Sequence, residues 1–193
     1  SAGNFRRVST QTYNVFGDVV EQRLLLDGTG ARVAVTSTRH DLRGLVTRQV
    51  DAEGGVTETA YDALGQAVRV TEYATKIDPA TPDAPVMAVT AQGTPDSAVG
   101  HDRVTTMRYD RRGLVVEQRR VGVLAAEGAQ SWSAGAPQLK ARDVVTLTVY
   151  DGAGNALQKS SQVVDTASGS LVQQGAVTRS RFDALGRLVR TVV

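Results

Sequence analysis

Short runs of β-branched residues alternate with polar turn residues along the whole chain. Segments rich in Val and Thr lie at residues 33–39, 56–60, 103–108, 144–149 and 177–181. Such segments, bounded by Gly and Asp, are typical of strands. The one trace of a helical period lies at 121–126, so the pattern predicts a nearly all-β fold.

Each segment leads into a recurring motif: an aromatic residue, Asp or Asn, two variable residues and then Gly. Three copies match Tyr-Asp-x-x-Gly strictly, whereas about 0.04 would arise by chance in a chain of this composition. The repeat organises residues 1–193 as one array, with hairpin turns near 14–17, 41–44, 62–65, 110–113, 151–154 and 183–186. The repeat residues are Tyr13, Asn14, Gly17, His40, Asp41, Gly44, Tyr61, Asp62, Gly65, Tyr109, Asp110, Gly113, Tyr150, Asp151, Gly154, Phe182, Asp183 and Gly186.

The motif has the chemistry of a tight hairpin turn. Asp at the first position accepts backbone N–H groups, and Gly at the fourth adopts a left-handed conformation. Each repeat is therefore predicted to be strand, turn, strand, and the hairpins to stack as a curved or twisted antiparallel strip. At the other end of the hairpins, turns are predicted at 27–30, 51–55 and 165–175.

Each motif Gly is followed by two positions whose residue type also recurs from copy to copy. The residue two places after it is apolar, and the residue four places after it is polar, as with Ala67 and Arg69. Residues two apart share a face of a regular strand. We therefore expect both to lie on one face, with the apolar side chain inward and the polar one near an edge.

Two insertions interrupt the array, because the bare repeat unit is the 21-residue interval from His40 to Tyr61. Residues 74–102 contain four of the five prolines and are predicted to form a long surface loop. Residues 122–142 contain the only tryptophan, Trp132. We expect Trp132 to hold this insertion against the sheet; the alternative is an exposed partner contact.

The repeat, in YDALGQAVRV, YDRRGLVVEQ and FDALGRLVRT, resembles the YD repeat of RHS proteins, toxin-complex subunits and teneurins. The resemblance runs from about residue 11 to 193, outside the insertions. It implies a piece of a β-hairpin shell that encloses or presents a toxin or effector domain, within a larger secreted or cell-surface polypeptide. The family's Asp-Pro-x-Gly cleavage motif is missing, because Asp78-Pro79 continues as Ala80-Thr81. His40 and Phe182 also depart from the family's Tyr.

Composition narrows the function classes. The 193 residues include no cysteine, which excludes disulfides, thiol catalysis and Cys-ligated metals. A net charge of +2 does not favour nucleic acid as the partner. No apolar run approaches the roughly 20 residues that span a bilayer. With 5% aromatic residues, the core must be built from Val, Leu and Ala.

Candidate chemistry is weak beside the repeat. Each motif supplies one carboxylate, so turn capping is favoured over calcium binding. The motif aromatics, including His40, are expected to fill the core rather than form a carbohydrate-stacking row. Ser97, His101 and Asp102 lack the elbow of a serine hydrolase, and two histidines without cysteine make no zinc site. The arginine pairs at 6–7, 111–112 and 119–120 are expected to form cross-strand ion pairs.

The sequence thus predicts a non-catalytic structural scaffold without cofactor or metal. The alternative is a repeat module that binds carbohydrate or a cell surface. The strand at 187–193 has no returning partner, so we expect an excised piece of a longer protein. Open strand edges at both ends are expected to pair with another copy.

Overall fold

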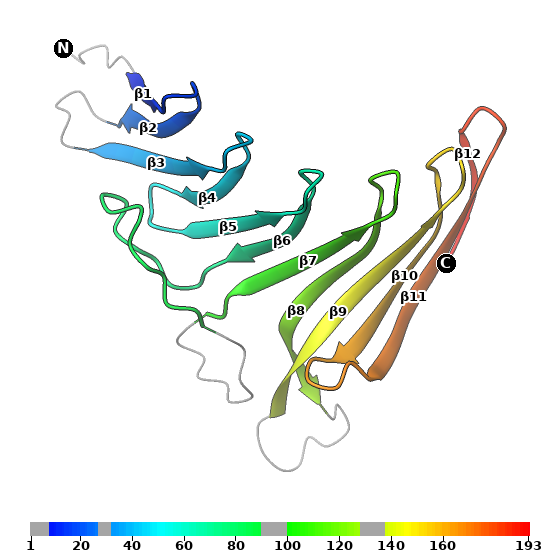
Figure 1. Ribbon diagram of the computed structural model, residues 1–193. Coiled ribbons are helices and arrows are strands. Elements are labelled where there is room, and N and C mark those ends of the chain that lie inside the picture. The colour runs from blue at the N-terminus through cyan, green and yellow to red at the C-terminus, as the bar shows by residue number, and fades with distance from the viewer. Residues whose placement is uncertain (1–7, 27–31, 90–99, 128–137) are drawn as a thin grey trace, which may run out of the picture.

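All regular structure in the described part of the chain is β (Figure 1). The computed structural model describes residues 8–26, 32–89, 100–127 and 138–193. Twelve strands form one open antiparallel sheet whose spatial order follows the sequence, which confirms the predicted fold class. The strands are β1 Ser9–Tyr13, β2 Val19–Leu25, β3 Val33–His40, β4 Val46–Val50, β5 Val56–Tyr61, β6 Ala67–Glu72, β7 Arg103–Tyr109, β8 Val115–Glu127, β9 Gln138–Tyr150, β10 Ala156–Asp165, β11 Leu171–Phe182 and β12 Leu188–Val192.

The six motif turns lie along one rim of the sheet, which we call the motif rim (Figure 1). On the opposite rim, the turn at 51–55 uses the same chemistry: Asp51 caps it and Gly54 has φ +84°. The predicted turn at 165–175 is shorter, because the amide of Asp165 bonds the carbonyl of Ser170 and β11 begins at Leu171. The predicted turn at 27–30 lies outside the described residues.

The second insertion is largely an extension of a hairpin. β8 and β9 have 13 residues each, and their ladder continues through the pairs Val123–Arg142 and Glu127–Gln138. The second insertion therefore continues the sheet at 122–127 and 138–142, and the helical trace at 121–126 is strand. Cross-strand pairing overrides a weak local period. Trp132 lies outside the described residues.

The first insertion folds back over the sheet. Residues 73–89 and 100–102 contain no strand, as the prolines predict. The amide of Ile77 donates to the carbonyl of Gly54, 2.9 Å away. Asp102 holds the two ends of the loop together, because its carboxylate accepts the amides of Ala74 and Val89, both at 2.9 Å.

Every hairpin contains a β-bulge just after its motif turn. Tyr61 lies opposite Ala67, whereas Ala60 lies opposite Arg69, so Val68 is the extra residue. The same shift occurs in the other five hairpins. Since Ala60 and Tyr61 point to opposite faces, so do their partners. The expectation that the apolar and polar positions share a face is wrong, because the bulge separates them.

The buried core lies on one face of the sheet. The buried valines are Val50, Val56, Val145 and Val164, and the register puts all four on the face that carries Ala60 and Arg69. The loop at 73–89 covers part of this face, which we call the loop face. The motif aromatics point to the other, the aromatic face. They are half-buried, and Tyr13 is 55% exposed, so the prediction that they fill the core is wrong.

Candidate functional site

The motif Asp residues cap their own turns. Asp62 Oδ1 accepts the amides of Leu64 and Gln66, both at 2.9 Å, and the amide of Gly65 donates to the Asp62 carbonyl at 3.2 Å. Gly65 has φ +81°, where Gly is favoured. The other five motifs repeat these contacts, and Asn14 makes them with its amide oxygen.

These turns favour the ionised carboxylate. The backbone amide of Leu114, followed by contacts with Arg112, lowers the pKa of Asp110. The amide and side chain of Arg187 lower the pKa of Asp183 in the same way. The pKa of Asp151 is lowered first by the side-chain amide of Asn155. Hydrogen bonds to the charged form are the common cause.

A tyrosine joins each interior hairpin to the one before it. The hydroxyl of Tyr61 donates to the carbonyl of Val46, that of Tyr109 to Ala67 and that of Tyr150 to Val115, at 2.9, 2.8 and 3.0 Å. Each acceptor is the residue two places after the preceding motif Gly. The motif aromatic therefore ties adjacent hairpins together near the motif rim.

Three motif aromatics depart from this contact. His40 lacks a hydroxyl, and Thr38 Oγ1 donates to the Val19 carbonyl in its place, while the buried Nδ1 of His40 has no hydrogen-bond partner. Phe182 has no polar atom to offer. Tyr13 lies on β1, the first described strand, and its hydroxyl donates to Gln11 Oε1 at 2.7 Å.

The turns also contact one another along the motif rim. A Cβ added at Gly65 would lie 3.5 Å from the Leu45 side chain, which directly follows the preceding motif Gly. Gly44, Gly113, Gly154 and Gly186 meet the corresponding residue of the preceding repeat in the same way. Arg43 and Arg112 each bond their own motif Asp and reach the carbonyl of the next one, at 2.8 and 2.6 Å.

The register between successive hairpins is uniform. In all five such interfaces, the residue four places after a motif Gly lies opposite the residue three places before the next motif aromatic. These pairs are Glu21–Ser37, Arg48–Glu58, Arg69–Thr106, Glu117–Leu147 and Gln158–Arg179. A single geometric rule therefore extends the sheet from one repeat to the next.

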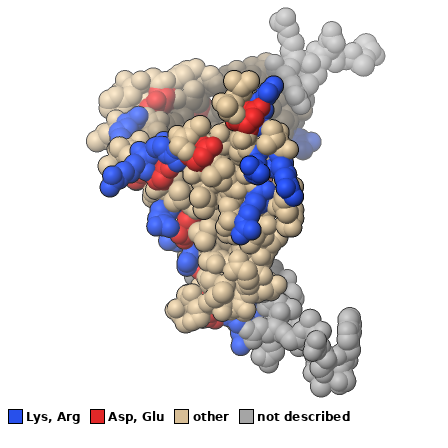
Figure 2. Space-filling view, turned by 90° about the vertical axis from the view of Figure 1, so that its right-hand side faces the viewer, with Lys and Arg blue, Asp and Glu red and all other residues tan. Residues whose placement is uncertain are grey.

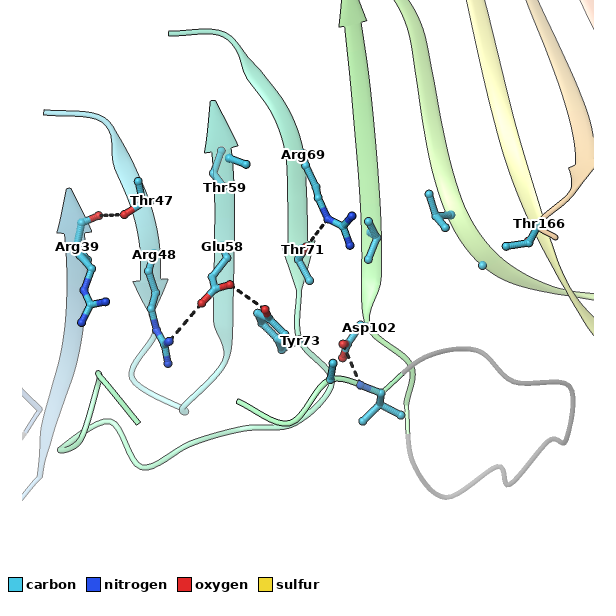
Figure 3. Close-up of a pocket in the computed structure, with 16 residues that line it drawn as sticks. Arg39, Thr47, Arg48, Glu58, Thr59, Arg69, Thr71, Tyr73, Asp102 and Thr166 are labelled. Carbon is cyan, nitrogen blue, oxygen red and sulfur yellow. Dashed lines mark hydrogen bonds and ion pairs between the residues drawn. The ribbon is translucent and has the colours of Figure 1, made fainter. Parts of the chain in front are cut away.

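An open cavity of about 580 Å³ lies on the loop face (Figure 3). Its lining includes Arg39 of β3 and Thr166, which follows β10, so the sheet curves around it. Figure 3 shows a row of side chains in which Arg48 points to Glu58 and Glu58 to Tyr73. Glu58 bonds Arg48 at 3.2 Å and the Tyr73 hydroxyl at 2.8 Å. Burial, followed by the hydrogen bond to Glu58, raises the pKa of Tyr73.

The arginines of this cavity differ in how they are paired. Arg48 bonds Glu58 and the Ala84 carbonyl, and its buried Nε has no hydrogen-bond partner. Arg39 pairs with Asp83 of the loop. Arg69 bonds the Thr71 hydroxyl at 3.4 Å and, among the described residues, pairs with no carboxylate. A solvated guanidinium in a cavity is suited to an anionic ligand.

The weaker sequence candidates all belong to the proline-rich insertion. Ser97 lies outside the described residues, and both carboxylate oxygens of Asp102 accept backbone amides of the loop. No group of three His, Asp or Glu side chains that could hold a metal occurs in the described ranges. Those ranges also contain no helix that could cross a membrane.

The arginine pairs are split between ion pairs and solvent. Arg119 pairs with Asp143 at 3.1 Å, and Arg112 pairs with its own Asp110 at 2.9 Å. Residues 6–7 are not described. Figure 2 shows Lys and Arg interspersed with Asp and Glu on one side of the molecule, so the basic residues do not form one continuous surface there.

The buried carboxylate of Asp143 was not predicted from the sequence. The side chain of Asp143 is 3% exposed and accepts hydrogen bonds from Arg119, the Gly122 amide and the Thr166 hydroxyl, at 3.1, 3.0 and 2.8 Å. It joins β8, β9 and the turn after β10. A lone carboxylate beside the apolar run at 144–149 was the available signal.

Comparisons with known proteins point to much longer chains. No protein-family model and no curated protein matches this sequence, but 29 chains of solved structures do. A chain of the Photorhabdus luminescens Tc holotoxin pore is 16% identical over 95% of this chain and 9% of its own length, with a TM-score of 0.39. A chain of the TcdB2–TccC3–TEV crystal structure is 17% identical over 94% of this chain and 12% of its own, with a TM-score of 0.31. This chain therefore spans only a small part of the chains it matches.

Proposed function

We propose that the chain is a non-catalytic structural scaffold, a strip of an RHS-type YD-repeat shell that encloses or presents a toxin or effector domain. The observation that carries the proposal is the tyrosine contact between successive hairpins, made by Tyr61, Tyr109 and Tyr150. This contact recurs between hairpins that all pair in the same register, so the same type of bond holds each of these hairpins to the one before it. Repeated contacts of this kind suit a wall.

The charged residues near the loop serve the scaffold rather than catalysis. Asp102 is adjacent to His101 in the sequence, and its carboxylate accepts hydrogen bonds from the amides of Ala74 and Val89. Both of these amides belong to the proline-rich insertion that Asp102 closes. We therefore assign Asp102 to loop closure.

Limited proteolysis of the full-length polypeptide that contains this chain tests whether a domain is enclosed. A variant with Tyr61→Phe, Tyr109→Phe and Tyr150→Phe loosens the strip without changing its surface charge. We expect the enclosed domain to be cleaved faster in this variant than in wild type, while Leu42→Ala, at a 94% exposed turn position, leaves protection unchanged. A domain cleaved in the wild-type polypeptide as fast as in isolation contradicts enclosure.

The cavity on the loop face favours a second candidate, a module that binds an acidic carbohydrate. The Arg69 guanidinium pairs with no carboxylate among the described residues, and Thr47, Thr59 and Thr71 line the same cavity. Calorimetric titration with uronic-acid and neutral oligosaccharides tests it. This function is supported if Arg69→Ala abolishes binding of the acidic sugar. The control is Arg103→Ala, which changes an 83% exposed side chain and should leave binding intact. Equal binding of neutral sugars contradicts this function.

A further inference from the structure

The loop at 73–89 is fixed at its ends, and its tip is held by two arginines of the sheet. The carboxylate of Asp102 accepts the amides of Ala74 and Val89, both at 2.9 Å, which fixes the ends. We call residues 81–84 the loop tip. A hydrogen bond of 3.0 Å from the last amide of this segment to its first carbonyl closes it into a turn. The loop tip is therefore able to move as a unit while the ends of the loop stay in place.

The loop tip occupies two guanidinium groups. Arg39 pairs with Asp83, and Arg48 donates to the Ala84 carbonyl at 2.6 Å. Arg39 and Arg48 lie directly opposite each other on β3 and β4 (Figure 3), and like charges in that position repel each other. The side chains of Arg39 and Asp83 are 57% and 74% exposed, so their ion pair contributes at most about 1 kcal/mol. The loop tip thus relieves a repulsion through a contact that another anion is able to replace.

Two cavities of the loop face meet at these arginines. Arg39 and Arg48 line both the cavity of about 580 Å³ and a second cavity of about 440 Å³. Pro82 and Asp83 of the loop tip line the second cavity. Lifting the tip from the two arginines would therefore join the cavities into one groove that runs across the strands.

The carboxylates that line these cavities from the sheet already have partners. Glu58 bonds Arg48 at 3.2 Å and the Tyr73 hydroxyl at 2.8 Å. Glu21, in the second cavity, pairs with Arg23 at 2.6 Å. The carboxylate of the loop tip is the one that leaves the groove when the tip moves.

The opened groove would offer guanidinium groups at two separated points. Arg69 pairs with no carboxylate among the described residues, and lifting the loop tip releases Arg39. Arg39 lies on β3 and Arg69 on β6, three strand spacings apart in the sheet, which is about 14 Å. The groove therefore suits a linear molecule with several acidic groups better than a single small anion.

We propose that the loop tip is a displaceable strap, whose Asp83 occupies Arg39 until a linear acidic oligosaccharide replaces it. The bound oligosaccharide places one acidic group on Arg39 and another on Arg69. This inference rests on the second candidate function, binding of an acidic carbohydrate, and adds its regulation and the length of its ligand. Strap and ligand compete for one guanidinium, so the loop sets the affinity.

Calorimetric titration with a uronic-acid tetrasaccharide tests this competition. Asp83→Asn removes the competing charge, and we expect it to raise the affinity about threefold to fivefold, which corresponds to at most about 1 kcal/mol. The matched control is Asp78→Asn, the same change in the same loop at a carboxylate that accepts the Ala80 amide. This variant should bind as wild type does. The monosaccharide, which is too short to reach both arginines, should bind at least about tenfold more weakly.

The outcomes separate the strap from the binding function. If Asp83→Asn binds no more tightly than wild type, or Asp78→Asn gains as much, the strap is overturned while the binding function stands. If neither wild type nor Asp83→Asn binds the tetrasaccharide, both are overturned. A monosaccharide that binds as tightly as the tetrasaccharide overturns the bridging of Arg39 and Arg69.

A single introduced thiol reports movement of the loop tip, because the chain contains no cysteine of its own. Ala84 is half-buried, and we expect the thiol of Ala84→Cys to react severalfold faster with Ellman's reagent when the tetrasaccharide is bound. Ala74→Cys, also half-buried and at the end fixed by Asp102, is the control and should react at an unchanged rate. A rate at Ala84→Cys that falls or stays constant on binding means that the ligand lies beside a closed tip, which overturns the proposal.

Discussion

The hydroxyl of Tyr61 lies 2.9 Å from the backbone carbonyl of Val46, beyond the point where the ladder between their strands ends. Backbone pairing between β4 and β5 extends from Val50–Val56 only to Arg48–Glu58. The tyrosine therefore supplies a hydrogen bond to a carbonyl that has lost its strand partner. Tyr109 and Tyr150 do the same beyond the ends of their ladders.

Removing one of these hydroxyls should weaken the sheet measurably. We expect Tyr61→Phe, Tyr109→Phe and Tyr150→Phe each to lower the free energy of unfolding by about 1 kcal/mol, the net value of a side-chain hydrogen bond. Urea unfolding measures this. Tyr13→Phe is the control and should cost close to nothing, because its hydroxyl bonds the exposed Gln11 and, in the described ranges, no strand carbonyl. Equal losses at Tyr13 and Tyr61 would contradict the role of the carbonyl acceptor.

The converse change should strengthen the last interface. Phe182 occupies the tyrosine slot, and the ladder between β10 and β11 ends at Gln158–Arg179, so the carbonyl of Ala156 stands where Val46 stands for Tyr61. We expect Phe182→Tyr to raise the free energy of unfolding by up to about 1 kcal/mol. Phe16→Tyr, at a 73% exposed turn position, should leave it unchanged. Thermal unfolding of both variants measures this difference. An equal rise in the stability of both variants would indicate a general effect of Tyr rather than a bond to the Ala156 carbonyl.

The strands and motif turns follow from local chemistry, which is why the sequence predicts them. Asp62 and Gly65 select their turn through contacts within five residues. The bulge was not predictable from alternation, because alternation assumes a regular strand. The recurring apolar and polar positions, such as Ala67 and Arg69, flank that bulge in the sequence. Because of the bulge they lie on opposite faces of the sheet, whereas regular alternation predicts one face.

The cavity and the Asp143 cluster depend on residues far apart in sequence. Asp143 meets Arg119 and Thr166 only because three strands and a turn converge. Likewise, Arg39 and Arg48 are held by Asp83 and Ala84 of a loop whose path over the sheet has no periodic signal. Proline content predicts the loop but not the face on which it lies.

Among the glycines in the described ranges, Gly54 should be the one whose replacement is most harmful. An added Cβ would overlap the backbone carbonyl of Ile77, and Gly54 has φ +84°. Gly17 has φ +88° with open space around it, so Gly17→Ala isolates the backbone strain, about 1–2 kcal/mol. We expect Gly54→Ala to cost at least about 1 kcal/mol more and to speed proteolysis within 73–89. Equal losses in the two variants would show that the loop yields easily.

Acid should weaken the motif turns. Hydrogen bonds from the Leu114 amide and then from Arg112 lower the pKa of Asp110, so its folded-state pKa lies below the unfolded value of about 3.9. The stabilisation is present above that unfolded pKa and is lost as pH falls through the folded-state pKa.

Asp110→Asn tests this linkage. Asn14 shows that an amide oxygen supports the same turn, so the variant should fold but lack the titrating carboxylate. We expect wild type to be more stable than Asp110→Asn at pH 7 and the difference to shrink as pH falls below about 4. Thermal unfolding across this range measures it. A difference that does not change with pH would contradict the linkage.

Asp143 should be the most sensitive charged residue in the described part of the chain. Its side chain is 3% exposed and accepts bonds from Arg119, the Gly122 amide and Thr166. Asp143→Ala leaves these donors without their acceptor, and we expect a loss of about 3 kcal/mol in urea unfolding. Asp83→Ala removes an ion pair whose Asp is 74% exposed, so it should cost less than about 1 kcal/mol. In hydrogen exchange, the Gly122 amide should lose protection in Asp143→Ala but keep it in Asp83→Ala. Equal losses of stability in the two variants would mean that the buried carboxylate does not hold β8, β9 and the turn after β10 together.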